Sequence, residues 1–258
     1  MIGIFDSGLG GLTALTKLRK LAPKADLIYF GDTARVPYGS RSVDTITKYA
    51  DEIITLLTEK GADRVLAACG TVSTVALPRL AGKYPVPVSG ILEPACAAAV
   101  KATKNGKIGV IATSASVNSG AYIREINSIM PEAQVLQTAC PLFVPLVEGG
   151  FVGRDCEITR LAARHYLEDI KREGCDTLLL GCTHYPIISD VIGDCLEGVT
   201  LINASEEAAR AVAAGYDTDG SGKVRMILSD RTQDLEKVMA HLGAEQDYEV
   251  EIMPVGRQ

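Results

Sequence analysis

Short apolar runs alternate with amphipathic segments along the first part of the chain. Four of the runs have the length and composition of buried strands: IGIF (2–5), LIYF (27–30), RVLAAC (64–69) and VPVSGI (86–91). The segment 43–61 predicts a helix, with Gly61 in the position that follows a helix end. Its predicted buried face consists of Val43, Ile46, Ala50, Ile53, Ile54 and Leu57. Strands that alternate with helices are typical of parallel α/β proteins.

The second part of the chain follows the same plan. The pattern predicts strands at 107–113, 177–182 and 199–204, and a helix at 117–130. Asn203 and Glu206 have the spacing of a capping box, so a further helix is expected to start there and run through Ala214.

Two motifs recur in the same order in both parts. IGIFDS at 2–7 resembles IGVIATS at 108–114, and LAACGT at 66–71 resembles LLGCTH at 179–184. Each part therefore has a polar turn after its first strand and a cysteine at the end of a later strand. This repeat predicts two related α/β halves.

The predicted fold class is α/β, with two pseudo-symmetric, doubly wound parallel-sheet domains. We expect residues 1–92 plus 208–258 to form the first domain and residues 93–207 to form the second. Ligands bind at the carboxyl ends of the strands in open α/β sheets. The active site is therefore expected in the cleft between the two domains.

The composition is that of a globular protein. Hydrophobic residues make up 47% of the 258 residues, and a chain of this length can bury a large core. The N-terminus lacks the basic and apolar regions of a secretory signal, and no apolar run approaches the roughly 20 residues that span a bilayer. We therefore expect a cytoplasmic protein without a membrane partner.

The charge distribution argues against nucleic acid as a partner. The net charge is −6, and the sequence has no block of lysine or arginine. An anionic ligand would therefore have to be held by local N–H and hydroxyl groups.

The cysteines do not form a disulfide or metal motif. There are seven of them, none in a C-x-x-C pair, and the three histidines are scattered at 165, 184 and 241. A disulfide scaffold or a zinc site is therefore not expected, and the sequence predicts no metal.

Cys69 and Cys182 stand apart because both follow apolar strands and both precede a threonine, directly or after one glycine. A thiol at the start of a helix feels the helix dipole and free N–H groups, which favour the thiolate. The alternative for each is a small buried apolar residue, which is the usual role of a free cysteine. The matching placement in the two halves favours a catalytic role.

Polar residues near the two cysteines suggest proton transfer. His184 comes two residues after Cys182 and can exchange a proton with it. Asp6 and Ser7 follow the first strand in a glycine-rich turn, where Asp6 could either accept a proton from Cys69 or cap a helix. Glu148, at the end of an apolar stretch, fits either a helix surface or the site.

The loop GDTARVPYGSRS at 31–42 is rich in proline, glycine and hydroxyl residues. It can be read as a simple turn before the next helix or as a wall of the ligand cleft.

Several of these segments, in this order, resemble a known family. They are IGIFDSGLGGLT, FGDTARVPYGSRS, AACGTVS, VPLVEGG and LLLGCTHYP. The chain resembles the glutamate racemases of the cofactor-independent aspartate/glutamate racemase superfamily. The resemblance extends from Ile2 to about Ala204, and the remaining residues are less distinctive. Aspartate racemases of the superfamily usually lack the Asp-Ser-Gly opening.

The resemblance implies interconversion of L- and D-glutamate without a cofactor, by two bases, to supply D-glutamate for peptidoglycan. Cys69 would act on D-glutamate with help from Asp6, and Cys182 on L-glutamate with help from His184. Glu148 would be a further helper. A homodimer is common among such enzymes.

The resemblance also implies a substrate-binding set. Its members are Asp6, Ser7, Pro37, Tyr38, Gly39, Gly70, Thr71, Thr113, Ser116, Thr183 and His184.

The sequence departs from the family pattern at two of these positions. Gly70 stands where the family usually has asparagine, and Ser116 where it usually has threonine. Loss of the asparagine amide would remove a hydrogen-bond donor and an acceptor near the charged groups of the substrate.

Two other functions therefore stay open at this point. One is racemisation of another amino acid, such as aspartate. The other is a catalytically impaired regulatory protein that binds a carboxylate.

Overall fold

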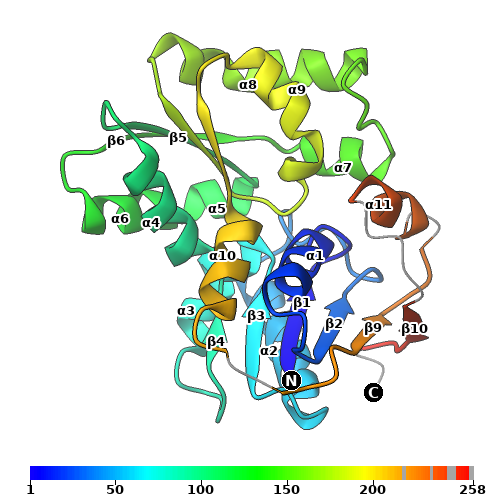
Figure 1. Ribbon diagram of the computed structural model, residues 1–258. Coiled ribbons are helices and arrows are strands. Elements are labelled where there is room, and N and C mark those ends of the chain that lie inside the picture. Colours follow the sequence, from blue (N-terminus) through cyan, green and yellow to red (C-terminus); the bar gives the residue numbers. More distant parts are fainter. Residues whose placement is uncertain (217–218, 233–234, 243–247, 256–258) are drawn as a thin grey trace.

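The computed structural model describes residues 1–216, 219–232, 235–242 and 248–255. The chain forms two parallel sheets, one above the other in Figure 1, with helices around both.

The first sheet contains strands from both ends of the chain. Its strands are β1 (Ile2–Asp6), β2 (Leu27–Gly31), β3 (Arg64–Ala67), β4 (Val88–Ser89), β9 (Val224–Leu228) and β10 (Glu249–Ile252). They lie in the order β10-β9-β2-β1-β3-β4. The helical segments of this half are α1 (Leu12–Leu21), α2 (Val43–Glu59), the π-helix η1 (Val72–Ala76), α3 (Leu77–Leu80) and α11 (Leu235–His241).

The second sheet lies within the middle of the chain. Its strands are β5 (Lys107–Ala112), β6 (Gln134–Ala139), β7 (Thr177–Leu180) and β8 (Thr200–Asn203), in the order β6-β5-β7-β8. The other helices are α4 (Leu92–Ala102), α5 (Ser114–Ser119), α6 (Ala121–Ile129), α7 (Phe143–Glu148), α8 (Glu157–Arg172), the 3₁₀ helix η2 (Tyr185–Ile188), α9 (Ser189–Cys195) and α10 (Ala204–Ala213).

The two sheets repeat one strand order. The core order β2-β1-β3-β4 of the first sheet matches β6-β5-β7-β8 of the second, and all of these pairs are parallel. β3 and β7 are therefore equivalent strands. Cys69 and Cys182 each lie two residues beyond the end of one of them. The predicted fold of two pseudo-symmetric α/β halves is confirmed.

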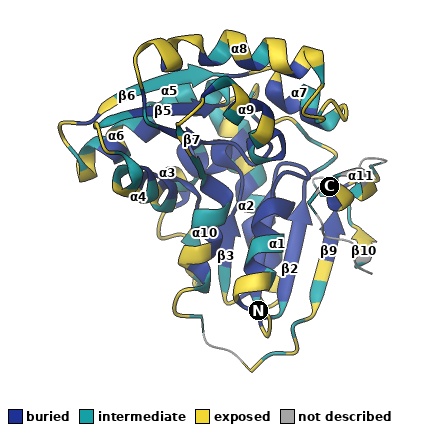
Figure 2. Ribbon diagram, turned by 45° about the horizontal axis from the view of Figure 1, so that its top comes forward, coloured by how far each residue is buried: buried dark blue, intermediate teal, exposed yellow. Residues whose placement is uncertain are grey.

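The central strands are buried on both faces. Every residue of β1, β2 and β7 is buried, and these strands appear dark blue in the interior of Figure 2. Strands of a parallel sheet that is covered on both faces read as continuous apolar runs, which is why the sequence revealed them.

The predicted helix at 43–61 forms as α2. The Ser42 side chain accepts a hydrogen bond from the N–H of Thr45 at its start. Gly61 follows the helix end with φ +92°, a backbone conformation that favours glycine. The predicted buried face is correct except at Val43, which is only partly buried.

Several predicted elements differ in extent from the structure. The strands expected at 64–69 and 177–182 end at Ala67 and Leu180, and the one at 86–91 shrinks to the two-residue β4. The helix expected at 117–130 is broken at Gly120, whose φ of +65° ends α5 before α6 begins. A left-handed residue cannot continue a right-handed helix.

Helix α10 joins the two halves. It packs against α1 and α4, and buried residues of all three helices, such as Leu15, Ala95 and Ala208, belong to one hydrophobic cluster. The expected domain boundaries at 92/93 and 207/208 remain predictions, and the second falls inside α10.

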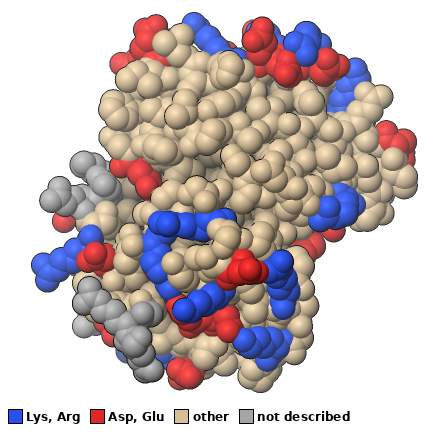
Figure 3. Space-filling model, turned by 180° about the vertical axis from the view of Figure 1, so that it is seen from behind, with Lys and Arg blue, Asp and Glu red and all other residues tan. Residues whose placement is uncertain are grey.

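Charged side chains are unevenly spread over the surface. On the face shown in Figure 3, basic and acidic side chains lie beside one another in the lower half, and a broad uncharged area lies above them.

None of the described helices combines the length and apolar character needed to cross a membrane.

The start of α10 gives a test of the capping prediction. Asn203 Oδ1 accepts hydrogen bonds from the N–H groups of Ser205 (3.1 Å) and Glu206 (3.2 Å). We expect Asn203→Ala to lower the free energy of unfolding by about 1 kcal/mol, because these N–H groups lose their partner. Urea denaturation measures the change.

The control for this measurement is Glu132→Ala at an exposed position between α6 and β6. It is expected to shift the unfolding free energy by less than about 0.5 kcal/mol. Equal changes in the free energy of unfolding for the two variants would contradict the capping role of Asn203.

Candidate active site

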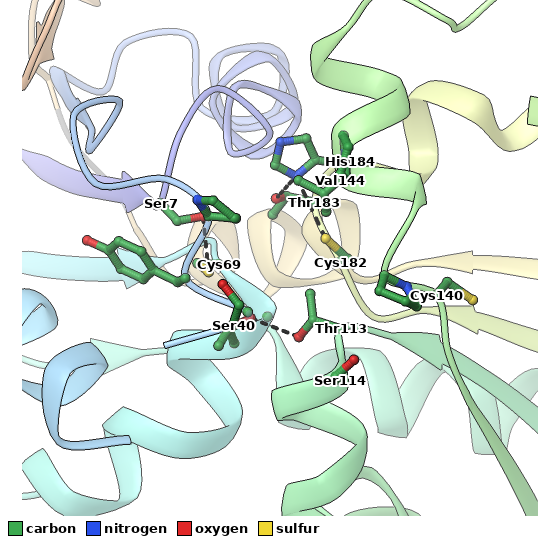
Figure 4. A pocket seen from close by; sticks show the side chains of 17 residues that line it. Ser7, Ser40, Cys69, Thr113, Ser114, Cys140, Val144, Cys182, Thr183 and His184 are labelled. Carbon is green, nitrogen blue, oxygen red and sulfur yellow. Dashed lines mark hydrogen bonds between the residues drawn. The ribbon is translucent and has the colours of Figure 1, made fainter. Parts of the chain in front are cut away.

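A cavity of about 190 Å³ lies between the two sheets, at the carboxyl ends of their strands. Its wall comes from both halves, as Figure 4 shows. The lining residues are Ser7, Pro37, Tyr38, Gly39, Ser40, Cys69, Gly70, Thr71, Thr113, Ser114, Cys140, Pro141, Val144, Pro145, Cys182, Thr183 and His184.

Most of the residues predicted for the site lie in this wall. The exceptions are Asp6, Ser116 and Glu148, which lie behind it. Each is joined by a hydrogen bond to a residue of the wall. The two cysteines reach the same cavity because the strands before them, β3 and β7, occupy equivalent places in the two sheets.

Cys69 is held at the start of a helix. Its carbonyl accepts hydrogen bonds from the N–H (3.0 Å) and the hydroxyl (2.9 Å) of Ser73. Its Sγ lies 3.6 Å from Ser7 Oγ, and the side chain is buried. The thiol therefore faces the turn that follows β1.

Burial controls the ionisation of Cys69. Burial, together with the negative charge of Asp6, raises the pKa of this thiol to about 12, although the N–H of Val72 and the hydroxyl of Ser7 act to lower it. The helix start was expected to favour the thiolate. In the structure this effect is outweighed, because a thiolate loses its hydration when it is buried.

Cys182 has a different set of neighbours. Its Sγ lies 3.7 Å from His184 Nδ1, and His184 Nε2 lies 3.2 Å from Glu148 Oε1. The three side chains form a continuous path from the thiol to a carboxylate that is about one third exposed. This path can carry a proton between the cavity and the surface.

His184 is buried, and its neighbours act on its pKa in opposite directions. Burial by itself would lower its pKa, but the hydrogen bonds to Cys182 and Glu148 and the negative charge of Asp6 raise its pKa well above the usual value. The imidazolium form can donate to Cys182 through one nitrogen and to Glu148 through the other.

Asp6 connects the two halves of the molecule. It is fully buried, its Oδ2 accepts the N–H of Gly8 (3.0 Å), and its Oδ1 accepts the hydroxyl of Thr183 (3.3 Å). Burial raises its pKa, against the lowering effects of His184 and of these hydrogen bonds. The hydrogen-bond partner of Cys69 in this region is Ser7 rather than Asp6. Asp6 can therefore act on Cys69 only through its charge or through a rearrangement.

Four hydroxyl groups form a chain across the cleft. Thr71 Oγ1 lies 2.9 Å from Thr113 Oγ1, and Ser116 Oγ lies 3.1 Å from both Thr113 Oγ1 and Thr74 Oγ1. Thr71 and Thr74 belong to the first half, and Thr113 and Ser116 to the second. Hydroxyl donors in this position can hold a carboxylate of a ligand that bridges the halves.

The loop at 31–42 forms one wall of the cavity. Tyr38 lines the cavity and donates its hydroxyl to the buried carboxylate of Asp32. Arg35 Nε also donates to Asp32 (2.6 Å), and Arg35 Nη1 donates to Glu52 on α2 (2.5 Å). These contacts fix the loop against the first half.

Asp32, which supports Tyr38 and Arg35, was not predicted from the sequence. It comes directly after β2, just as Asp6 ends the neighbouring strand β1, and this position was a usable signal. Six other lining residues were also not predicted: Ser40, Ser114, Cys140, Pro141, Val144 and Pro145. Their positions in loops or in the short helices α5 and α7 do not distinguish them from residues that merely pack.

The structure also changes the interpretation of Gly70. A Cβ atom at this position would lie 2.2 Å from the carbonyl oxygen of Gly181 and 3.5 Å from Ile91 Cδ1. A side chain at position 70 would therefore point toward the contact between the halves. Gly70 itself lines the cavity, so the expected loss of an amide near the substrate stays a prediction.

In the described part of the chain, no three His, Cys, Asp or Glu side chains are placed so that they could hold a metal ion. Among the described lining residues there is no lysine or arginine. Backbone N–H groups, hydroxyls and the imidazole of His184 are thus the groups available to a bound anion.

The Asp/Glu/Hydantoin racemase family matches residues 13–212, which is most of the chain. The chain belongs to this family. A glutamate racemase of Aquifex aeolicus is 44% identical over 238 residues, which is 92% of each chain.

Solved structures of the same family have the same fold. A glutamate racemase isoform from Bacillus anthracis superimposes with a TM-score of 0.93 at 30% identity and covers 99% of this chain and 97% of its own. A glutamate racemase from Francisella tularensis, in complex with D-glutamate, has a TM-score of 0.88 at 33% identity, with 98% and 96% covered. The protein is therefore an enzyme of the racemase class, within the isomerases.

The pKa of Cys69 predicts its reactivity in the unliganded racemase. At neutral pH we expect iodoacetamide to modify Cys69 much more slowly than Cys156, because only the thiolate reacts. Cys156 is partly exposed, and hydrogen bonds from Thr159 lower its pKa. Peptide mass spectrometry after timed labelling measures both rates.

The labelling rate of Cys69 should also rise with pH toward its pKa of about 12. Labelling at pH 7 and pH 9 checks the direction. Faster labelling of Cys69 than of Cys156 at neutral pH would contradict the raised pKa.

Proposed function

We propose that this racemase interconverts L- and D-glutamate by transferring the α-proton between two cysteines. The observation that carries the proposal is the presence of Cys69 and Cys182 in the wall of one cavity, at the ends of equivalent strands. The relatives named glutamate racemase, which match over nearly the whole chain, support glutamate as the substrate.

Inversion at a carbon requires a base on one face and an acid on the other. In the direction from L to D, the Cys182 thiolate takes the α-proton, so that a C–H bond breaks and an S–H bond forms. The Cys69 thiol then gives its proton to the opposite face of the carbanion. In the reverse direction the two cysteines exchange roles.

The resting state favours a thiol at Cys69, because burial raises its pKa. Cys69 can therefore donate the proton that converts the carbanion into D-glutamate. His184 takes the proton from Cys182 or returns it, with Glu148 as its partner at 3.2 Å. The charge of Asp6 favours the thiol form of Cys69, and this thiol donates a hydrogen bond to Ser7 Oγ.

The substrate is held by groups of both halves. The Thr71–Thr113–Ser116 hydroxyls and the backbone N–H groups at Gly70 and Thr71 bind carboxylates, as N–H groups at the start of a helix do. Donors fixed in a buried cavity also stabilise the negative charge of the carbanion-like intermediate. Pro37, Tyr38, Gly39 and Thr183 complete the wall, and Asp6 orients Thr183.

The remaining parts of the proposal rest on the family resemblance. The reaction needs no cofactor and no metal, the enzyme acts in the cytoplasm as a homodimer, and its product supplies peptidoglycan synthesis. Nucleic acid and membranes are not partners. The domains extend over 1–92 plus 208–258 and over 93–207.

Heavy water and two variants test the mechanism. The parent protein should incorporate deuterium at the α-carbon of glutamate during racemisation. Cys69→Ser and Cys182→Ser should each lower the racemisation rate by roughly 10²–10⁴-fold, because each removes one acid–base group. Circular dichroism of glutamate and proton NMR measure the two processes.

Cys156→Ser, a change at a partly exposed thiol outside the cavity, is the control and should retain the parent rate. Full activity in either cavity variant would contradict the two-cysteine mechanism. Glutamate binding by calorimetry without any deuterium incorporation would identify a catalytically impaired binding protein instead.

The choice of substrate has its own test. Aspartate was an alternative because Gly70 lacks an amide. The relatives named glutamate racemase favour glutamate. We therefore expect kcat/KM for glutamate to exceed that for aspartate by at least about tenfold, the difference that one methylene can provide. Racemisation of both amino acids by the parent protein measures the ratio, and a preference for aspartate would overturn the assignment.

A further inference from the structure

The loop that follows β2 reaches across the cleft. Pro37, Tyr38 and Gly39 of this loop line the cavity. A Cβ at Gly39 would lie 3.0 Å from Thr113 Cβ, so the backbone of the loop packs directly against the second half. The position of this loop therefore sets the shape of the cavity on one side.

The loop is held to the first half at two places. Its middle is held where Tyr38 and Arg35 donate to the buried carboxylate of Asp32. Its start is held by the turn that follows β9, the strand beside β2 in the first sheet (Figure 1).

Hydroxyl groups make the contact between the start of the loop and this turn. Thr33 Oγ1 donates to the carbonyl of Asp230 (2.6 Å) and accepts the N–H of the same residue (3.0 Å). Ser229 Oγ accepts the N–H of Ala34 (2.8 Å), and Ser229 is buried. Three hydrogen bonds therefore join segments that are 195 to 197 residues apart in the chain.

These bonds continue the contact between β2 and β9 beyond the end of the sheet. The last paired residues are Gly31 and Leu228, and the Ser229 N–H donates to the Gly31 carbonyl (3.0 Å). After this point the side-chain hydroxyls of Thr33 and Ser229 join the two segments. An apolar side chain of similar size at either position would leave the sheet intact and remove the bonds to the loop.

We propose that Thr33 and Ser229 are positioning residues for substrate binding, which hold the cavity loop in place through the turn after β9. A loop that is already ordered need not be ordered by the ligand, so these hydrogen bonds strengthen binding without touching the substrate. The segment after Ala204 carries no distinctive motif, and this contact gives it a part in the site. The inference rests on the proposed function, in which glutamate occupies this cavity.

The kinetic test compares two substitutions of Thr33. Thr33→Val keeps the shape of the side chain and removes the hydroxyl, whereas Thr33→Ser keeps the hydroxyl. We expect Thr33→Val to raise KM for glutamate by about 5–10-fold, roughly the effect of one or two lost hydrogen bonds. Its kcat should stay within about twofold of the parent value, because a less ordered loop weakens ground-state and transition-state binding alike. Ser229→Ala should behave in the same way, and Thr33→Ser should keep the parent KM.

Hydrogen exchange gives a second readout that does not depend on turnover. The peptide that covers residues 31–42 should exchange faster in Thr33→Val and in Ser229→Ala than in the parent protein, because the loop opens more readily. Mass spectrometry of the exchanged peptides measures this rate, and far-UV circular dichroism checks that the variants are folded.

The matched control lies at the other end of the same two strands. Asp26 directly precedes β2, Ser221 lies shortly before β9, and Ser221 Oγ donates to Asp26 Oδ1 (2.8 Å). Ser221→Ala therefore removes a hydroxyl bond between the same two segments, at residues that do not line the cavity. It should keep the parent kcat, KM and exchange rate of the loop.

Several results would overturn the proposal. One is a parent KM and parent loop exchange in Thr33→Val and Ser229→Ala, and another is an equal effect of Ser221→Ala. A fall in kcat at unchanged KM would place the contact in the chemistry rather than in binding. Failure of both variants to fold would make the hydroxyls a requirement of the core.

Failure of the proposed function gives a different result. In that case the parent protein itself does not racemise glutamate. The hydrogen-exchange comparison still decides whether the two hydroxyls hold the loop, because it needs no substrate.

Discussion

Burial of ionisable groups between two parallel sheets is the constraint on which the rest of this structure depends. Asp6, His184 and both cysteines are nearly or fully removed from water. An isolated charge in such a place is costly, so each group needs a partner. The partners come from both halves, as when Asp6 of the first half accepts a hydrogen bond from Thr183 of the second. The same contacts that hold the halves together therefore set the acid–base character of the site.

The two halves share a strand order but differ at their cysteines. Burial and the negative charge of Asp6 keep the pKa of Cys69 high, whereas Cys182 lies beside His184 and, through it, Glu148. The symmetry places a thiol on each side of the cavity, and the local asymmetry gives the two thiols different neighbours. A two-base racemase needs both features, since one thiol must give a proton while the other accepts it.

The cleft is closed from backbone to backbone at Gly70 and Gly181. Hydrogen bonds to Ile111, Tyr122 and Thr74 hold the two loops that meet there. The geometry of the site is thus fixed by hydrogen bonds to the cores of both halves. The hydroxyls of Thr71 and Thr113 join the halves at a second place close by.

The sequence alone determined the α/β class, the internal repeat, the buried strands at the centres of the two sheets, and the two cysteines. It could do so because apolar periodicity and short motifs are local properties. It did not reveal β6, β9 and β10, the break at Gly120 or the role of Asp32. Strand order, the pKa of Cys69 and the direction of a side chain at position 70 depend on residues distant in the chain. Only the tertiary structure decided them, because burial and close contact arise when the two halves come together.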